Sequence, residues 1–195
     1  MVRILELEKY ALENNIPIMM KDGIEFLTNY IKENNITNIL EIGSAIGYSA
    51  IRMCLVNDDV KVTTIERDIK RYNEAIKNIN EFNLNDRITI INDDAFNVEL
   101  NDKYDLIFID AAKSQYIKFF EKFKLNLKEN GVIVSDNLDF HGLVNKDINT
   151  IESRNVRGLV RKLNTYIEFL KDNEEFETTF YEIGDGISIS KLKHE

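Results

Sequence analysis

The chain has 195 residues, of which 44% are hydrophobic, and carries a formal net charge of −9 at pH 7. A chain of this length can bury one sizeable core but hardly two, so we expect one domain spanning residues 1–195. The acidic balance argues against broad, non-specific adhesion to nucleic acid or anionic lipid, and it leaves room for a local basic patch.

No segment has the composition of a targeting or membrane-spanning sequence. Residues 1–15 alternate charged and apolar side chains and lack the apolar centre of a signal peptide. No apolar run approaches the roughly 20 residues that a spanning helix needs. The single cysteine, Cys54, stands in an apolar stretch. We therefore expect a cytoplasmic protein without a membrane partner, in which Cys54 is a buried apolar side chain rather than a nucleophile.

Strand and helix signals alternate along the chain. Short apolar, β-branched runs occur at residues 37–42, 60–65, 87–91, 104–109 and 131–135, each followed by helix-like or irregular sequence. Short, nearly continuous apolar strands are typical of a parallel sheet that is covered on both faces. Right-handed crossovers between such strands predict a doubly wound, Rossmann-like α/β fold.

The last part of the chain has a different pattern. Residues 176–183 and 187–192 flank a Gly-Asp-Gly turn signal, which predicts an antiparallel hairpin at one edge of a mostly parallel, seven-stranded sheet. Apolar side chains at helical spacing predict one long helix over residues 154–173. A further helix is predicted over residues 114–128.

The segment ILEIGSAIGYSA, residues 39–50, lies where the first predicted strand ends. In open α/β sheets, ligands bind beyond the carboxyl ends of the strands. Gly43 and Gly47 allow the backbone to approach a ligand closely. The dinucleotide fingerprint would have a glycine in place of Ala45, so the turn fits a pyrophosphate poorly. Taken alone, it could equally be a simple tight turn.

Acidic residues follow the next two strands. Glu66 ends the second strand, at the position from which a carboxylate accepts both hydroxyls of a ribose. Asp94 and Ala95 follow the third strand, where they could meet the edge of an adenine. An acidic site repels a pyrophosphate and attracts a sulfonium cation. The three turns together favour a nucleoside that carries no phosphate.

Two carboxylates and an amide follow the fourth and fifth strands. Asp110 ends the fourth strand, and Asp136 and Asn137 end the fifth. Such oxygen ligands suit Mg²⁺, and the sequence has no Cys/His cluster that would prefer zinc. Taken singly, Asp110 could cap the following helix and the other pair could form a turn. Their joint placement beside the nucleoside site favours a magnesium site.

Lys113 lies three residues after Asp110, at the start of a predicted helix. A nearby metal ion and the positive end of the helix would lower its pKa and make the neutral amine available as a general base. An exposed, solvated lysine is the alternative. We hypothesise that Mg²⁺ chelates two adjacent substrate oxygens, that Lys113 takes the hydroxyl proton, and that the oxyanion attacks the sulfonium methyl group.

In this order the motifs resemble the S-adenosylmethionine-dependent, metal-dependent O-methyltransferases of the catechol and caffeoyl-CoA type. The resemblance rests on EIGSAIGYSA, TIERD, DDAF, FIDAAKSQY, VSDN and GDGISIS, and it covers the chain from Ile16 onward. The sequence is most similar to the bacterial branch that methylates 5-hydroxyuridine at the tRNA wobble position. The resemblance implies the class I methyltransferase fold, S-adenosylmethionine and Mg²⁺ as cofactors, and a homodimer.

The resemblance also implies roles for particular residues. Asp110 joins Lys113 as a catalytic residue, and residues 1–35 form N-terminal helices on the substrate side. The cofactor contacts that it implies are Glu41, Gly43, Gly47, Ser49, Glu66, Asp94, Ala95 and Asp110. This chain departs from the pattern at Ala45, where the mammalian catechol enzyme has a tyrosine, and it starts about one helix later than longer relatives.

The substrate has to offer two neighbouring oxygens, as both a catechol and 5-hydroxyuracil do. Residues 153–167 carry four basic side chains and no acidic one. Helical spacing puts Arg154, Arg157 and Arg161 on one face. That face could grip the phosphates of a tRNA anticodon loop while one base enters the site, or it could be an ordinary solvated face.

Three hypotheses follow. The leading one is a magnesium-assisted methyltransferase that acts on wobble 5-hydroxyuridine in tRNA and gives 5-methoxyuridine. The second is the same chemistry on a small catechol-like metabolite or acyl thioester. The third is a cofactor-binding or RNA-binding protein on the same scaffold. The joint presence of Asp110, Lys113, Asp136 and Asn137 counts against the third hypothesis.

Overall fold

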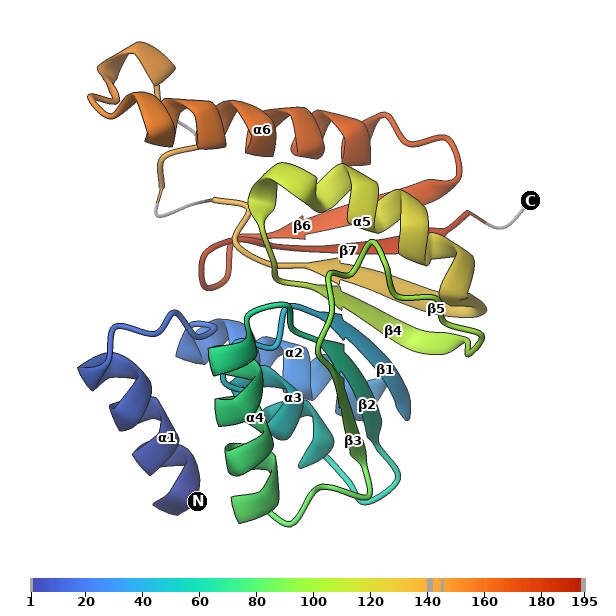
Figure 1. The fold of residues 1–195 in the computed structure, drawn as a ribbon. Coiled ribbons are helices and arrows are strands. Elements are labelled where there is room, and N and C mark those ends of the chain that lie inside the picture. The colour runs from blue at the N-terminus through green and yellow to red at the C-terminus, as the bar shows by residue number, and fades with distance from the viewer. Residues whose placement is uncertain (1, 140–141, 145, 194–195) are drawn as a thin grey trace.

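The computed structural model describes residues 2–139, 142–144 and 146–193. A seven-stranded sheet forms its centre, with helices on both faces (Figure 1). The strands are β1 (Asn38–Ile42), β2 (Lys61–Ile65), β3 (Ile88–Ile91), β4 (Tyr104–Ile109), β5 (Leu127–Ser135), β6 (Phe176–Tyr181) and β7 (Ile187–Leu192). The helices are α1 (Val2–Glu13), α2 (Lys21–Glu33), α3 (Tyr48–Cys54), α4 (Ile69–Glu81), α5 (Tyr116–Phe123) and α6 (Arg154–Lys171).

The strand order is β3-β2-β1-β4-β5-β7-β6. Strands β1 to β5 run parallel, and β7 is antiparallel to both β5 and β6. From β1 the chain adds β2 and β3 on one side and then β4 and β5 on the other. Such a switch point, here between β1 and β4, opens a crevice at the carboxyl ends of the strands. The predicted fold, a doubly wound sheet with a C-terminal antiparallel hairpin, is confirmed.

The sheet is buried on both faces, because its strands supply apolar side chains to two separate clusters. One cluster joins the sheet to helices α1 to α4, and the other joins it to α5 and α6 (Figure 1). Cys54 is fully buried in the first cluster, with its thiol 3.4 Å from the carbonyl of Val60, as its apolar surroundings predicted. None of the helices in the described residues is long and apolar enough to cross a membrane.

One predicted helix is wrong in its extent. Over residues 114–128 the structure has a 3₁₀ turn (Lys113–Gln115), then α5, then a second 3₁₀ turn (Lys124–Asn126), and β5 already begins at Leu127. Leu127 is buried and pairs with Tyr104 of β4 next to a β-bulge. Sheet pairing and burial here override the local helical signal of a charged sequence.

Side-chain caps fix the starts of α4 and α6. The Asp68 side chain accepts hydrogen bonds from the backbone N–H groups of Lys70 and Arg71 and so begins α4 directly after the turn that contains Glu66. The Ser153 hydroxyl accepts from the N–H of Val156 and begins α6. Both caps place the first turn of a helix at the same edge of the sheet as the carboxyl ends of the parallel strands (Figure 1).

Candidate active site

A cavity of about 490 Å³ lies beyond the carboxyl ends of the parallel strands. Its walls come from segments that are far apart in the sequence: residues 17–19, 42–45, 48–49, 65–67, 93–96, 110–113 and 137. The segments at 42–45 and 110–113 follow β1 and β4, the two strands that flank the switch point. The cavity therefore occupies the place at which an open α/β sheet binds its ligand.

The turn after β1 requires its glycines for packing of the backbone. Gly43 has a φ of +97°, and a Cβ atom on it would lie 2.3 Å from the carbonyl oxygen of Asp110. Gly47 has a φ of +82° at the start of α3, where a Cβ would lie 3.3 Å from that of Ala75. Ala45 also has a positive φ, of 45°. Close packing between the β1 and β4 turns therefore explains Gly43 before any ligand is considered.

The carboxylate of Glu66 is held in the cavity wall by backbone groups. One oxygen accepts from the N–H of Ala45 at 3.0 Å and the other from the N–H of Asp68 at 2.8 Å. The side chain is buried, yet it faces the cavity. A carboxylate oxygen has more than one acceptor site, so each oxygen keeps the capacity to accept a hydroxyl. This geometry suits the predicted contact with a ribose.

Glu41 and Gly47 lie behind the cavity wall instead of on it. Glu41 is fully buried and accepts hydrogen bonds from the hydroxyls of Ser49 and Thr64. Burial raises its pKa to about 7, although the two hydroxyls act in the opposite direction. Ser49 does line the cavity. Ser49 therefore joins Glu41 to the cavity wall by a hydrogen bond.

The loop after β3 brings Asp94 and Ala95 to the wall, as the sequence predicted. Asp94 accepts a hydrogen bond from the N–H of Phe96 at 3.0 Å, which folds the loop back on itself. Phe96 of this loop, which no sequence pattern marked as a site residue, stacks on Phe119 of α5 with ring centroids 4.8 Å apart. Both rings face the cavity and add an apolar surface beside the acidic loop.

The three predicted metal ligands come together at the ends of β4 and β5. The side-chain nitrogen of Asn137 lies 3.1 Å from a carboxylate oxygen of Asp110 and 3.0 Å from one of Asp136. Asn137 has a left-handed backbone with a φ of 64°, which is uncommon outside glycine and brings its amide back toward the strand ends. The hydroxyl of Tyr116 donates to the carbonyl of Asp136 and fixes the turn.

Of these two carboxylates, Asp136 is buried and Asp110 is partly exposed to the cavity. Asp136 is 2% exposed, and burial together with the charge of Asp110 raises its pKa to about 8. Burial also raises the pKa of Asp110, while the positive charge of Lys113 acts in the opposite direction. Like charges held this close in a buried site destabilise the ionised pair unless a cation joins them.

The pKa of Lys113 is lowered, in the predicted direction but for a different first cause. Burial lowers it, and the charges of Asp110, Asp136 and Asp185 raise it. Lys113 begins a 3₁₀ turn and not an α-helix, so the helix end that the sequence suggested is two residues further on. The lysine therefore lies in the cavity wall beside three acidic groups.

The donor set fits a magnesium ion. In the described part of the chain, no three side chains of the types His, Cys, Asp and Glu are grouped to hold a metal. The amide of Asn137 would have to complete the set, with its oxygen turned toward the ion in place of the nitrogen. Two carboxylates and an amide oxygen are hard ligands that Mg²⁺ accepts while it keeps positions for water or substrate.

Asp185 is a site residue that the sequence analysis treated only as part of a turn. It is 5% exposed, and its negative charge raises the pKa of both Asp110 and Asp136. Its carbonyl accepts from the N–H of Asp139 at 2.7 Å, which joins the β6–β7 turn to the segment after β5. The sequence does place Asp185 between two glycines. That pattern is also typical of a simple turn, so it did not indicate a site residue.

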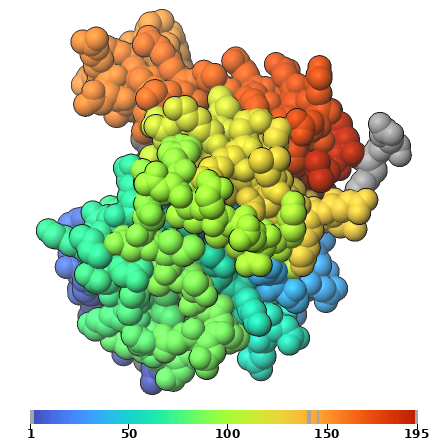
Figure 2. Space-filling model, turned by 45° about the vertical axis from the view of Figure 1, so that its right-hand side comes forward, coloured from blue at the N-terminus to red at the C-terminus, as the bar shows by residue number. Residues whose placement is uncertain are grey.

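The basic residues of α6 divide into two kinds. Arg154 and Arg161 are exposed. Arg157 is partly buried and donates to the carbonyls of Ile151 at 2.6 Å and Glu152 at 3.1 Å, so it holds the chain that enters the helix. The first turns of α6, in orange, project from the body of the molecule in Figure 2. Two of the three predicted arginines are thus available to a partner.

Comparisons with known proteins show the family of this chain. The sequence profile of the O-methyltransferase family matches residues 2–193. A caffeoyl-CoA O-methyltransferase from Populus kitakamiensis is 28% identical over 192 residues, which is 94% of this chain and 81% of the relative.

Solved structures extend the comparison. The crystal structure of a Staphylococcus aureus protein, provisionally named a caffeoyl-CoA O-methyltransferase, has a TM-score of 0.92 at 39% identity and covers 97% of this chain and 92% of that one. An O-methyltransferase from Bacillus cereus, solved in complex with SAH, has a TM-score of 0.83 at 25% identity and covers 99% and 91%. The chain therefore belongs to the O-methyltransferase family and is an S-adenosylmethionine-dependent O-methyltransferase.

Proposed function

We propose that this enzyme transfers a methyl group from S-adenosylmethionine to one of two neighbouring oxygens of its substrate with the help of Mg²⁺, and that the substrate is wobble 5-hydroxyuridine in tRNA. The observation that carries the chemistry is the grouping of Asp110, Asp136 and Asn137 beside Lys113 at one cavity wall. A bound Mg²⁺ would supply positive charge to the substrate oxygens and lower the pKa of the hydroxyl.

The opposite walls of the cavity support the assignment of the methyl donor. Glu66 presents a fixed acceptor for ribose hydroxyls, and the loop at residues 93–96 offers polar and apolar groups that a base could contact. The site holds several acidic side chains, which favour a sulfonium cation. The relative from Bacillus cereus was solved with SAH, the product form of this donor.

Different residues have different roles in the proposed reaction. Lys113 accepts the proton of the substrate hydroxyl, because its lowered pKa makes the neutral amine accessible and its place in the wall brings it to the site. Asp110 and Asp136, with Asn137, would hold the ion, which would supply positive charge beside the substrate oxygens. The methyl carbon then leaves sulfur and bonds to the substrate oxygen, and the cavity walls hold the two in line.

The basic face of α6 supports tRNA as the substrate. Arg154 and Arg161 are exposed. They belong to α6, which begins at the same edge of the sheet as the carboxyl ends of the parallel strands (Figure 1). A chain with a net charge of −9 needs such a local basic surface to hold phosphates. A base in a single-stranded loop can enter a pocket at low cost.

A small metabolite is the second candidate, favoured by the names of the relatives. The relatives from Populus kitakamiensis and Stellaria longipes, which cover 94% and 78% of this chain, are both named caffeoyl-CoA O-methyltransferases. A catechol or caffeoyl group offers the same pair of neighbouring oxygens as 5-hydroxyuracil. The site at β4 and β5 serves both substrates equally well.

One experiment separates these candidates. The enzyme is incubated with S-adenosylmethionine labelled in its methyl group, Mg²⁺, and either tRNA bearing 5-hydroxyuridine or catechol, with and without EDTA. We expect label in the tRNA, lost on chelation and restored by added Mg²⁺. Label in catechol with unaltered tRNA would overturn the tRNA assignment, and full activity in EDTA would overturn the role of the metal.

The variant Arg154→Ala/Arg161→Ala tests the contribution of α6. It should weaken tRNA use and reduce the slope of affinity against salt by about 1 for each phosphate contact removed, without a change in cofactor affinity. Lys171→Ala, which removes a charge from the far end of the same helix, is the matched control. Arg157 is unsuitable because it supports the chain before the helix.

A further inference from the structure

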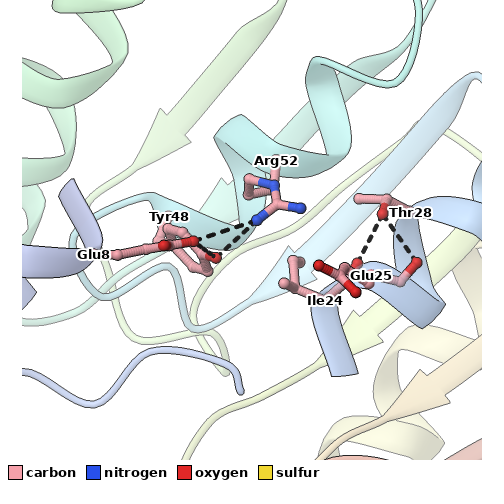
Figure 3. Close-up of polar contacts among 6 residues, drawn as sticks. All are labelled: Glu8, Ile24, Glu25, Thr28, Tyr48 and Arg52. Atoms are coloured by element: carbon pink, nitrogen blue, oxygen red, sulfur yellow. Dashed lines mark hydrogen bonds and ion pairs between the residues drawn. The ribbon is translucent and has the colours of Figure 1, made fainter. Parts of the chain in front are cut away.

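Three side chains outside the reaction fasten the N-terminal helix α1 to the cavity wall. Tyr48, the first residue of α3, donates its hydroxyl proton to a carboxylate oxygen of Glu8 on α1 at 2.6 Å (Figure 3). Arg52, one turn later on α3, donates to the Tyr48 hydroxyl at 2.9 Å and lies 3.5 Å from the same Glu8 oxygen. We call this group of Glu8, Tyr48 and Arg52 the α1 latch.

The hydroxyl at the centre of the α1 latch is buried, and the two charged side chains around it, Glu8 and Arg52, are partly exposed. Tyr48 is 2% exposed, and its hydroxyl both donates and accepts a hydrogen bond. Burial and the acceptor Glu8 raise its pKa, so the phenol keeps the proton that it donates. The Arg52 guanidinium also lies 5.7 Å from the centre of the Tyr48 ring. Loss of Glu8 would leave a buried hydroxyl without its acceptor and a guanidinium without its counter-charge.

Outside the α1 latch, α1 buries little apolar surface. Leu7 and Ala11 are the buried apolar residues that α1 gives to the core, with Ile4 packed beside them. A groove of about 560 Å³ separates the neighbouring side of the helix from α4. Leu5 and Leu12 are 60% and 80% exposed. Two further polar contacts join α1 to α4, from Arg3 to the carbonyl of Glu81 and between Tyr10 and Glu74, and both come from exposed side chains. Because so little apolar surface holds α1, its polar contacts matter for docking, and the α1 latch is the most buried of them.

Movement of α1 would reach the cavity by two routes. Tyr48 belongs to both the α1 latch and the cavity wall. Pro17, Ile18 and Met19, in the connector between α1 and α2, also line the cavity. The far end of that connector is fixed, because Asp22 at the start of α2 accepts from the N–H of Gly184 at 3.1 Å. The other end of the connector is joined to α1 and would move with it.

We propose that Glu8 is a positioning residue, which through the α1 latch holds Tyr48 and the α1–α2 connector in the cavity wall, so that docking of α1 and binding of S-adenosylmethionine stabilise each other. The proposal rests on the assignment of this cavity to the cofactor. Because coupling between two binding events is reciprocal, the cofactor should tighten the docking of α1 by the same factor by which docked α1 tightens the cofactor.

The first test measures the affinity for S-adenosylhomocysteine by calorimetry. We expect Glu8→Ala to weaken it by about tenfold, within the usual range of such coupling. Glu8→Gln keeps an acceptor for Tyr48 without the charge that faces Arg52, and should recover part of the loss. Glu13→Gln is the matched control, since Glu13 is an exposed acid on the same helix that lies 3.7 Å from Lys9.

Kinetics separate positioning from catalysis. Glu8→Ala should raise the KM for S-adenosylmethionine by a factor similar to its effect on affinity, and kcat should change by less than about twofold. Equal KM values for Glu8→Ala and the wild type would overturn the proposal, and so would a loss confined to kcat. Should Glu8→Ala fail to fold, Glu8→Gln and Arg52→Gln carry the same comparison.

Limited proteolysis tests the reciprocal effect. Trypsin cleavage at Lys9 and Lys21, on either side of the connector, should be slowed by S-adenosylhomocysteine in the wild type and slowed much less in Glu8→Ala. If S-adenosylhomocysteine protected both proteins from trypsin to the same extent, the proposed role of the α1 latch would be wrong, but the assignment of the cavity would stand. A wild-type protein that binds no S-adenosylhomocysteine would instead overturn the assignment of the cavity, which keeps the two failures distinct.

Discussion

The acidic side chains in the two halves of the candidate site have different partners. At the ends of β1 and β2, Glu41 and Glu66 are both satisfied by neutral donors: two hydroxyls for the first and two backbone N–H groups for the second. At the ends of β4 and β5, Asp110 and Asp136 face each other with one amide and one lysine nearby. The first half is complete without a ligand, and the second has excess negative charge.

This difference indicates how each half works. Acids that are already hydrogen-bonded act as fixed walls, which suits the binding of a cofactor by shape and by its hydroxyls. Acids that repel each other store unfavourable energy, which a divalent cation relieves, and the same charges keep a lysine close. The half at β1 to β3 should therefore control affinity and stability, while the half at β4 and β5 controls turnover.

The largest effect should come from Lys113→Met. Without a group to take the hydroxyl proton, kcat should fall by about 10²–10⁴-fold. The affinity for S-adenosylhomocysteine should change little, because the cofactor contacts of the other half are intact. Single-turnover rates and calorimetry measure the two quantities. Turnover equal to that of the wild type would reject Lys113 as the base.

Glu41→Gln probes the stability of the other half. The pKa of a buried carboxyl raised from 4.5 to about 7 means that the folded state binds more protons than the unfolded one between these values. Wild-type stability is therefore lost as pH rises through that window, by an amount on the order of 3 kcal/mol. Glu41→Gln lacks this loss, so its advantage in urea unfolding should grow between pH 5 and pH 8. A difference in the free energy of unfolding that stayed constant with pH would contradict the raised pKa of Glu41.

Asp136→Asn removes one of the two repelling charges. The metal-free variant should melt at a higher temperature than the metal-free wild type, with the difference increasing toward pH 8, where Asp136 of the wild type ionises. Mg²⁺ at about 100 times its Kd should stabilise the wild type by about 2.7 kcal/mol and the variant much less. Calorimetric melting with Mg²⁺ or EDTA measures both. An equal response to Mg²⁺ would place the ion elsewhere.

The smallest effect should come from Asp68→Ala. The side chain of Asp68 caps α4 beside Glu66, and loss of a cap costs about 1 kcal/mol. Its backbone N–H still holds Glu66, so we expect a small fall in stability with kcat preserved. Chemical denaturation and initial rates provide the comparison. A large loss of kcat here would contradict the division between the two halves.

Sequence patterns predicted most of the fold because each signal was local. The apolar strands, the Gly-Asp-Gly hairpin and the stripe of α6 depend on neighbouring residues, and the structure has them within a few residues of the predicted ends. The start of β5 failed because Leu127 joins the sheet through Tyr104, a partner far away in the sequence. Strand pairing between residues this far apart in the sequence cannot be recognised from the residues next to each of them.

The candidate site was predictable where strand ends carry it. Asp110, Asp136 and Asn137 meet because parallel strands share one edge, and that rule needs only the strand positions. Phe96 and the α1 latch depend on side-chain contacts across the fold, such as that between Glu8 and Tyr48, forty residues apart. No spacing in the sequence encodes them. The burial of Glu41 behind the wall was missed for the same reason.

The most direct test of the central claim is the binding of Mn²⁺, a paramagnetic substitute for Mg²⁺, followed by electron paramagnetic resonance in the presence of S-adenosylhomocysteine. The wild type should bind one ion per chain, displaced by Mg²⁺, and both Asp110→Asn and Asp136→Asn should lose that site while still binding S-adenosylhomocysteine. Undiminished binding of Mn²⁺ in both variants, or no binding in the wild type, would contradict a metal site at the ends of β4 and β5.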